Sequence, residues 1–325
     1  MNTMRAVVQD TYGTADVLRL AEVDRPEVAA NEVLIQVLAA GIDRGTEHLL
    51  TGKPYAMRVM GFGFRKPKNK VPGLDVAGRV VAIGSAVTRF AVGDEVYGIS
   101  RGSFAEYAVA VEDKVSLKPT NLTFEQAAVV PVSGLTALQA LRDAGRVEAG
   151  QRVLVIGASG GVGSYAVQVA KTFGAEVTGV SSAAKTDLVR SLGADHVIDY
   201  STQDFADGTN TYDLIIDTGG NSTIARLRRA LTPRGTLVIV GGEKAGKLTG
   251  MGRQLRALAI SPFVGQRLTM QVPKENFRDL DALTAMIEAG SVTPSIDRTY
   301  PLDDTADAVR HLVAGKVRGK VAITI

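Results

Sequence analysis

The sequence contains no cysteine, no tryptophan and only three histidines among its 325 residues. Without cysteine there is no disulfide, no thiolate nucleophile and no thiolate-bound metal. His48, His196 and His311 lie far apart in the sequence and lack the spacing of a metal site. His48 is most simply a surface or packing histidine, because a single histidine without a partner is weak evidence for catalysis. We therefore expect no metal.

Long apolar runs are also missing. No stretch reaches the roughly 18 apolar residues that a membrane span requires, and the N-terminus, MNTMRAVVQD, lacks the apolar core of a signal peptide. The net charge of +3 is too small to indicate nucleic acid without a concentrated basic face. The 45% hydrophobic and 22% charged residues are typical of a globular protein large enough for two domains. We expect a cytoplasmic protein with neither a membrane span nor a nucleic-acid partner.

The most informative segment present is RVLVIGASGGVGSYAVQVAK, residues 152–171. A strand-like apolar run leads into a glycine-rich turn, a helical pattern follows at once, and a second strand pattern, EVTGV, comes next. Glycines let the backbone approach a ligand closely, and the N–H groups at the start of the helix favour a phosphate. Read as A-x-G-x-x-G, the fingerprint falls on Ala158, Gly160 and Gly163. This context predicts a dinucleotide site; the alternative is a tight β–α turn without a ligand.

The pattern of elements changes near residue 120. Before it, short β-rich segments such as EVLIQVLAAGI and VAGRVVAIG alternate with turn residues, which predicts a small β-barrel or sandwich. After it, strands and helices alternate as in a parallel, doubly wound sheet. We expect helices to begin at Thr123 and near Thr136, and to end at Gly145, Gly174 and Gly193, the first of these as a left-handed cap. From about residue 273 the order is helix, strand, helix, strand.

Jointly, these motifs resemble the medium-chain dehydrogenase/reductase superfamily, in its zinc-free quinone oxidoreductase branch. The resemblance spans nearly the whole chain and rests on AAGIDRG, PGLDVAGRVVAIG, GDEVYG, GSFAEYAV, AAVVPVSGLTALQAL, GASGGVG and the tail YPLDDTADAVRHLVAGKVRGKVAI. It implies an α/β fold in two domains. Residues 1–120 and 272–325 would form a GroES-like β-barrel catalytic domain, and residues 121–271 a Rossmann cofactor domain, with the active site between them. It also implies a homodimer formed through the strand at 268–272.

Departures from the family pattern concern the metal. Zinc-dependent relatives place a cysteine where this chain has Asp43, and a His-Glu pair where it has Leu74 and Asp75. Their four-cysteine structural zinc loop has no counterpart here. Catalytic zinc needs about three good protein ligands, which two carboxylates and a leucine do not supply. Asp75 has the alternative role of bonding the backbone in a turn, and Asp43 that of pairing with Arg44 or a nearby lysine.

The expected cofactor is NADPH. An NAD site usually ends its second strand with an acidic side chain, about 20 residues past the glycine turn. Here residues 179–182 read Gly-Val-Ser-Ser, and hydroxyls with a nearby ammonium suit a 2′-phosphate better than an aspartate does. In the resembling branch, matching Ser, Lys and Tyr positions surround that phosphate. Lys185 is alternatively a solvated residue in the first turn of a helix. The expected cofactor contacts are Thr136, Ala158, Ser159, Gly160, Gly161, Val162, Gly163, Ser181, Ser182, Lys185, Tyr200 and Gly241.

The resemblance places Asp43, Tyr55 and Thr136 near the nicotinamide as catalytic-site residues. Thr136 is alternatively a residue at a helix N-terminus with a local backbone bond, and Tyr55 a half-buried barrel residue. No Tyr-x-x-x-Lys pair or His–Asp pair supplies the acid that ketone reduction without a metal requires. A quinone is an easier acceptor, because its developing charge is delocalised. Reduction of an alkenal or enone is the alternative activity, and an NADPH-binding sensor, structural or RNA-binding protein with little turnover is the alternative class.

One basic loop belongs to none of the motifs described above. Residues 61–70, GFGFRKPKNK, combine two phenylalanines with four cationic side chains. Family topology places this loop near the mouth of the active site, where it would attract flat or anionic acceptors or the phosphates of the cofactor. The alternative is a solvated loop whose charges aid solubility.

Overall fold

The computed structural model describes residues 3–241 and 250–325. The chain divides into a first compact unit, Met1–Leu135 with Glu275–Ala289 and Pro294–Ile325, and a second, Thr136–Lys274 with Gly290–Thr293. The first boundary lies after residue 135, not after residue 120, because helix α2 (Phe124–Ala128) packs on strands of the first unit.

The second boundary also lies slightly later than expected, after residue 274 instead of residue 271. Gln139 holds the backbone of Lys274 in the second unit: its side-chain oxygen accepts from the Lys274 N–H at 2.9 Å, and its amide donates to the Lys274 carbonyl at 2.7 Å.

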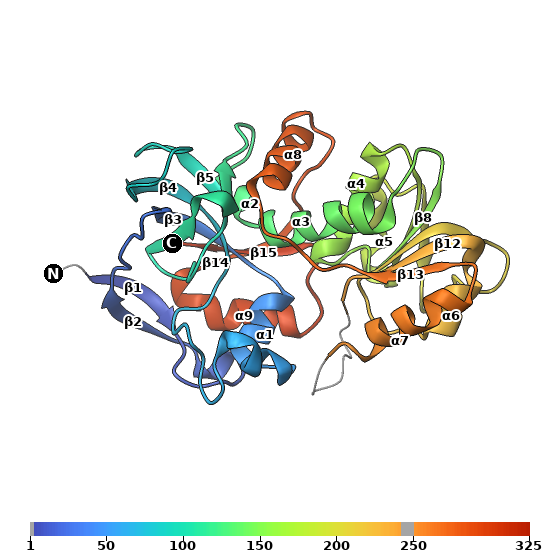
Figure 1. Cartoon of the computed structure of the whole chain (residues 1–325), viewed down its shortest axis with the longest axis horizontal. Helices are drawn as coiled ribbons and strands as arrows, with labels where there is room; N and C mark the ends of the chain where they lie inside the picture. Colours follow the sequence, from blue (N-terminus) through green and yellow to red (C-terminus); the bar gives the residue numbers. More distant parts are fainter. Residues whose placement is uncertain (1–2, 242–249) are drawn as a thin grey trace. The chain divides into compact units, whose positions relative to one another are not determined.

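The second unit is a six-stranded parallel sheet in the order β10-β9-β8-β11-β12-β13 (Figure 1). Its strands are β8 (Arg152–Ile156), β9 (Glu176–Ser181), β10 (His196–Asp199), β11 (Tyr212–Asp217), β12 (Leu231–Ile239) and β13 (Arg267–Met270). Its helices are α4 (Gly161–Thr172), α5 (Thr186–Ser191), α6 (Ile224–Arg229) and α7 (Gly252–Ile260), and α3 (Pro131–Gln139) leads into it. This strand order reverses direction between β8 and β11, which is where a doubly wound sheet binds its ligand.

The predicted parallel sheet is confirmed. Strands β8 and β11 consist of apolar runs whose central side chains are fully buried, as a sheet covered on both faces requires. Thr123 caps α2 as predicted, and Gln126 completes a capping box with it. Thr223 caps α6 by accepting from the Arg226 N–H at 3.2 Å.

The end of the α3 segment differs from the prediction. Gly145 was expected to be the left-handed cap, but the residue with positive φ is Arg146, at +54°. Gly145 is needed for another reason: a Cβ there would lie 2.8 Å from the Ala140 carbonyl oxygen and 2.9 Å from the Leu214 side chain. Gly174 and Gly193 do adopt left-handed conformations where α4 and α5 end, with φ of +78° and +96°.

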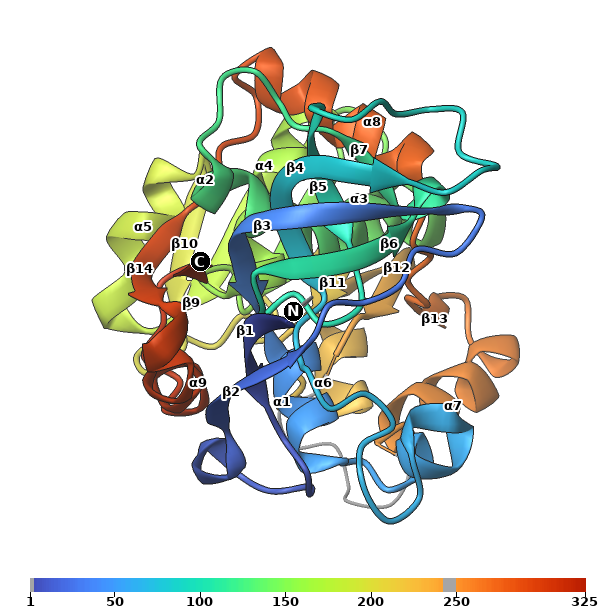
Figure 2. The same ribbon diagram turned by 90° about the vertical axis from the view of Figure 1, so that its left-hand side faces the viewer.

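The first unit is built around a mostly antiparallel sheet in the order β14-β15-β3-β4-β5-β7, with β6 paired to β3 (Figure 2). The strands of this sheet are β3 (Glu32–Ile42), β4 (Asp75–Ile83), β5 (Glu95–Ile99), β6 (Tyr107–Val111), β7 (Val115–Leu117), β14 (Ile296–Pro301) and β15 (Lys320–Thr324). A hairpin of β1 (Thr3–Val8) and β2 (Arg19–Asp24) pairs separately, and the helices are α1 (Arg44–Thr51), α2, α8 (Phe277–Glu288) and α9 (Thr305–Val313). In the described part of the chain, no helix is long and apolar enough to cross a membrane.

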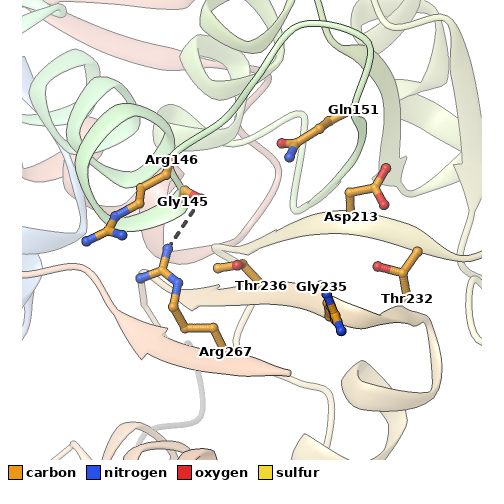
Figure 3. A pocket seen from close by; sticks show the side chains of 9 residues that line it. Gly145, Arg146, Gln151, Asp213, Thr232, Gly235, Thr236 and Arg267 are labelled. Atoms are coloured by element: carbon orange, nitrogen blue, oxygen red, sulfur yellow. Dashed lines mark hydrogen bonds between the residues drawn. The ribbon is translucent and has the colours of Figure 1, made fainter. Parts of the chain in front are cut away.

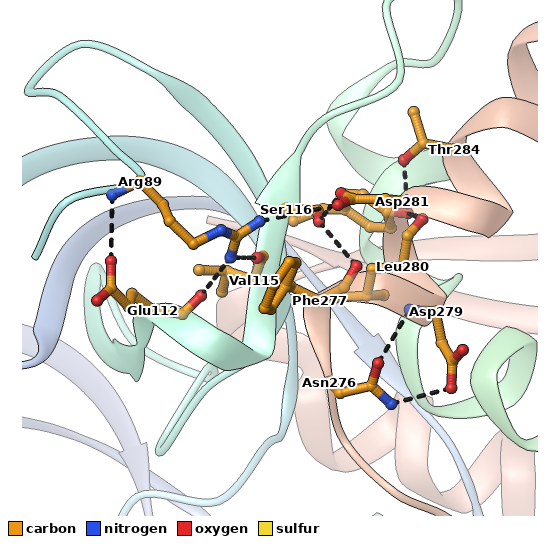
Figure 4. Close-up of polar contacts among 11 residues, drawn as sticks. Arg89, Glu112, Val115, Ser116, Asn276, Phe277, Asp279, Leu280, Asp281 and Thr284 are labelled. Atoms are coloured by element: carbon orange, nitrogen blue, oxygen red, sulfur yellow. Dashed lines mark hydrogen bonds and ion pairs between the residues drawn. The ribbon is translucent and has the colours of Figure 1, made fainter.

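A polar cluster holds α8 in the first unit (Figure 4). The Arg89 guanidinium stacks 3.6 Å from the centre of the Phe277 ring and donates to the Val115 carbonyl at 3.0 Å. The Ser116 hydroxyl donates to the Asp281 carboxylate. Because these contacts join β7 to the first turns of α8, the chain returns to the first unit after residue 274.

Candidate functional site

The glycine turn leaves the carboxyl end of β8 next to the reversal point of the sheet. Gly157 has a φ of +83°, and Gly160 is the extended residue that begins α4. At Gly163 a Cβ would lie 2.1 Å from the Gly157 carbonyl oxygen, so only glycine allows this approach. The spacing of the fingerprint therefore has a direct steric cause.

The start of α4 is built to receive an anion. Gly160 offers no capping side chain, and the N–H groups of Gly161, Val162 and Gly163 have no hydrogen-bond partner within the described residues. These donors and the positive end of the helix dipole fit a phosphate group. Ala158 and Ser159 are buried in the turn, and Ala158 donates its N–H to the Val180 carbonyl at 3.0 Å. The cradle thus fits the pyrophosphate of a dinucleotide.

The four residues expected around the 2′-phosphate lie together at the carboxyl ends of β9 and β10. Tyr200 donates its N–H to the Ser181 carbonyl at 3.1 Å, and Lys185 donates its N–H to the Ser182 carbonyl at 2.9 Å. Lys185 ends a short helical turn, Ala183–Lys185, and precedes the six-residue α5, so it does not lie in the first turn of that helix.

Asp199 is an acidic neighbour that the sequence reasoning missed. It ends β10 and pairs in register with Ser181 of β9. Its carboxylate accepts from the Ser201 N–H at 3.0 Å and from the Ser201 hydroxyl at 2.8 Å. Hydrogen bonds from Ser201, and from the backbone of Ala183, lower the pKa of Asp199 below its usual range. The Asp199 carboxylate is therefore already occupied by hydrogen bonds from its own turn and from the backbone of Ala183.

A buried ion pair shapes the loop after β11. Asp217 is fully buried; it accepts from the Gly220 N–H at 3.0 Å and pairs with Arg253 of α7. Its backbone carbonyl accepts from the N–H of Val240, next to the expected cofactor contact Gly241. Asn221 and Arg256 help to line a cavity of about 370 Å³ beside this pair. Sequence reasoning missed this pair. The available signal was an acidic residue, Asp217, at the end of an apolar strand pattern, and nothing nearby in the sequence identifies Arg253 as its partner.

In the first unit, Asp75, which the resemblance aligns with a zinc-ligand position of zinc-dependent enzymes, belongs to a buried charge pair. Asp75 and Lys320 are each 1% exposed, with Lys320 Nζ 3.5 Å from Asp75 Oδ2 and 3.0 Å from Ser133 Oγ. Asp75 Oδ1 accepts from the Val132 N–H at 2.9 Å, at the start of α3. Asp75 therefore does bond the backbone, as its alternative role required. Lys320 was missed, although a lysine that begins an apolar strand was the available signal.

Asp43 lies close enough to this pair to influence it. Its Oδ1 caps α1 by accepting from the Thr46 N–H at 2.9 Å, and its Oδ2 is buried without a hydrogen-bond partner among the described residues. Burial raises the pKa of Asp75 to about 7; Lys320 opposes that rise, and the charge of Asp43 adds to it. Arg44 forms its ion pair with Glu47 at 2.6 Å.

The remaining expected residues lie in different surroundings. Thr136 is buried inside α3, which begins at Pro131, so the alternative of a residue at the helix N-terminus is wrong. Tyr55 is 41% exposed, with the Arg58 guanidinium 4.9 Å from the centre of its ring. In the basic loop 61–70, the Lys68 N–H donates to the Phe62 carbonyl at 2.9 Å, which closes the loop.

The side chains near Asp43 do not form a zinc site. Asp75 is engaged by Lys320 and by the backbone, and Leu74 offers no ligand atom. Across residues 3–241 and 250–325, no three His, Asp or Glu side chains are grouped so as to hold a metal ion. Metal independence of the reaction stays a prediction.

Comparison with known proteins gives two matching family models. Residues 29–120 match the alcohol dehydrogenase GroES-like domain, and residues 192–323 match a model described as zinc-binding dehydrogenase. An NADPH-dependent alkenal/one oxidoreductase of Arabidopsis thaliana is 36% identical over 98% of this chain and 79% of its own length. The quinone oxidoreductase of Sus scrofa is 30% identical over 99% of this chain and 98% of its own. The solved quinone oxidoreductase from Coxiella burnetii superposes with a TM-score of 0.87 at 29% identity, covering 99% of both chains.

The raised pKa of Asp75 predicts a pH-dependent stability. Because the folded pKa of about 7 exceeds the ordinary value of 3.8, the fold favours the protonated acid. This contribution to stability is complete below about pH 4 and is lost as the pH rises through 7. Asp75→Asn, which stays neutral, should therefore gain on the order of 2–4 kcal/mol of unfolding free energy relative to wild type between pH 5 and pH 8. Denaturant melts across that range measure the gain. The exposed Asp24→Asn should show none, and a constant difference for Asp75→Asn would contradict the assignment.

Proposed function

Because the chain belongs to the medium-chain dehydrogenase/reductase superfamily, in its zinc-free quinone oxidoreductase branch, we propose that it transfers hydride from NADPH to a quinone. The observation that carries the proposal is the glycine turn, where the unpaired N–H groups at the start of α4 suit a pyrophosphate. The second candidate activity is reduction of a carbon–carbon double bond conjugated to a carbonyl. It is favoured by the name of the Arabidopsis relative.

Each part of the cofactor has a proposed set of contacts. Gly161, Val162 and Gly163 donate to the pyrophosphate, and Gly241 and Thr136 border the nicotinamide. Ser181, Ser182, Lys185 and Tyr200 would hold the 2′-phosphate, supported by their common place at the ends of β9 and β10. An ammonium and several hydroxyls attract a phosphate dianion, and the carboxylate of Asp199 is already bonded to Ser201.

The chemistry requires little from the protein beyond positioning. When bound, NADPH supplies the hydride. Asp43 and Tyr55 would border the acceptor, but neither is asked to act as a full general acid, because a quinone or conjugated alkene spreads the incoming charge over several atoms. Asp43 already caps α1, which supports a positioning role. We propose that the reaction proceeds without a metal, since Asp75 is committed to Lys320.

The first prediction concerns cofactor choice. Lys185→Ala should weaken NADPH binding about 10- to 100-fold, the range for loss of one desolvated charge-assisted bond, and should leave NADH binding nearly unchanged. Titration of both cofactors measures this. Lys316→Ala removes the same charge elsewhere and should have no effect. Equal loss for NADPH and NADH, or a wild-type preference for NADH, would refute the assignment.

The second prediction concerns the acceptor. Quinones and conjugated enones should be reduced under anaerobic conditions, and simple aliphatic ketones should not. Asp43→Asn and Tyr55→Phe should each lower turnover only about tenfold, because neither supplies an acid–base contribution of 10²–10⁴. Fast reduction of an aliphatic ketone, abolished by either substitution, would reveal a general acid. Tight NADPH binding with negligible turnover on every acceptor would instead favour the sensor or structural class.

The third prediction concerns assembly. Strand β13 pairs with β12 along one edge only among the described residues, and beside it α7 and the following turn expose Leu255 (55%) and Phe263 (87%). Two copies joined through β13 would cover both the unpaired backbone and these apolar side chains. Light scattering at micromolar concentration should therefore give twice the chain mass of 34.2 kDa. A particle of the single-chain mass would contradict this arrangement.

A further inference from the structure

A second cavity in the cofactor unit lies near the amino ends of the parallel strands, whereas the glycine turn lies at their carboxyl ends. Its volume is about 310 Å³. Gln151, Asp213 and Arg267 line it where β8, β11 and β13 begin, and Thr236 of β12 pairs in register with Arg267 (Figure 3). The glycine turn follows the carboxyl end of β8, which has five residues. At about 3.3 Å per residue, the two sites are roughly 15 Å apart. A ligand in this cavity therefore does not reach the proposed pyrophosphate cradle.

The cavity carries an excess of positive charge. Three arginines line it, Arg146, Arg234 and Arg267, against one carboxylate, Asp213. None of the three forms an ion pair with an acidic side chain in the described part of the chain. Asp213 Oδ2 accepts from the Arg152 N–H at 3.0 Å, which engages it at the start of β8. The guanidinium groups are thus left without an anionic partner of their own.

Two of these arginines are held close together. Arg267 donates to the carbonyls of Ala144 and Gly145, which fixes its guanidinium at the cavity wall, and Figure 3 shows Arg146 beside it. Burial lowers the pKa of Arg267, and the nearby charge of Arg146 lowers it further. Two cations in such proximity repel each other unless an anion lies between them.

The backbone of Arg146 gives an independent indication. It is the only residue other than glycine with a positive φ in the described chain. Glycine or asparagine adopts this left-handed conformation at lower cost, so the backbone conformation disfavours an arginine at this position. Arg146 lines the cavity in spite of this backbone, and its guanidinium lies beside that of Arg267 (Figure 3).

Neutral donors complete the lining. The Thr232 and Thr236 hydroxyls have no hydrogen-bond partner among the described residues. Gln151 accepts from the Glu148 N–H at 3.1 Å through its side-chain oxygen, which leaves its amide nitrogen able to donate. Arginine guanidinium groups, together with hydroxyl and amide donors around them, are the groups that bind phosphate and other tetrahedral oxyanions.

We propose that this cavity is a second anion site, which binds a small phosphate-bearing molecule between Arg146, Arg234 and Arg267. The volume of about 310 Å³ is at the small end of ligand pockets, so it holds a phosphate with a short attached group and not a dinucleotide. Occupancy would remove the repulsion between Arg146 and Arg267 and fasten the start of β13 to the segment that follows α3. Binding should therefore stabilise the second unit.

Calorimetric titration at constant ionic strength tests the proposal, with inorganic phosphate, pyrophosphate and glycerol 3-phosphate as probes and with NADPH absent or saturating. Arg146→Gly removes the charge and suits the left-handed backbone, so it should fold at least as stably as wild type. It should bind phosphate about tenfold more weakly or worse, and the exposed Arg234→Ala should also weaken binding. Tighter binding of glycerol 3-phosphate than of phosphate would identify the attached group as part of the ligand; equal binding would identify free phosphate as sufficient.

Two controls separate this site from others. Arg298→Ala removes an exposed positive charge in the first unit, and Lys185→Ala alters the proposed 2′-phosphate site; both should bind phosphate as the wild type does. The proposal is overturned if no probe binds, if Arg146→Gly and Arg234→Ala bind normally, if Arg298→Ala loses binding equally, or if saturating NADPH or Lys185→Ala abolishes the signal. The last result would assign the phosphate to the cofactor site and would leave the proposed function standing.

Discussion

A buried charge pair, Asp75 with Lys320, is the interaction on which the first unit depends. The two residues lie 245 positions apart in the sequence, at the first residues of β4 and β15. Both side chains are removed from water, and Lys320 opposes the rise in pKa that burial imposes on Asp75. Removing Lys320 would take away the cation that opposes the desolvation of Asp75, and loss of the partner of a buried charge costs about 3–5 kcal/mol. The last strand of the chain is thereby fastened to the sheet built by the first third.

The same pair determines where α3 begins. Val132 donates its N–H to Asp75, and the Ser133 hydroxyl oxygen accepts from Lys320 Nζ, so the first turn of the helix is bonded to both members. Three residues further along α3 lies Thr136, the residue proposed to border the nicotinamide. A carboxylate at the position of a zinc ligand in related enzymes is thus used to place a helix.

Local features of the structure could be predicted from the sequence, and long-range partners could not. The glycine turn, the parallel strands and the caps at Thr123, Gly174 and Gly193 depend on neighbouring residues, and each was predicted. The partnership of Asp75 with Lys320, like that of Asp217 with Arg253, is settled only when distant segments pack together. The sequence analysis singled out Asp75 but not Lys320, and neither member of the Asp217–Arg253 pair.

The error at Gly145 has the same origin. A glycine after a helical pattern is usually the left-handed cap, yet here a Cβ is excluded by the Ala140 carbonyl and by the Leu214 side chain of a later strand, and Arg146 takes the cap conformation. The boundary between the units shifted for a related reason, since α2 packs on strands that lie far from it in the sequence, β3 and β4 before it and β15 after it. Packing between non-adjacent segments overrode local preference in both cases.

The central claim is that the chain reduces conjugated acceptors with NADPH and without a metal. The most direct measurement is quinone-dependent oxidation of NADPH by protein dialysed against a strong chelator, with metal content determined by elemental analysis on the same sample. The account predicts that the metal-free protein keeps the full rate and that added zinc does not raise it. A rate that disappears with the metal and returns with zinc would contradict the account.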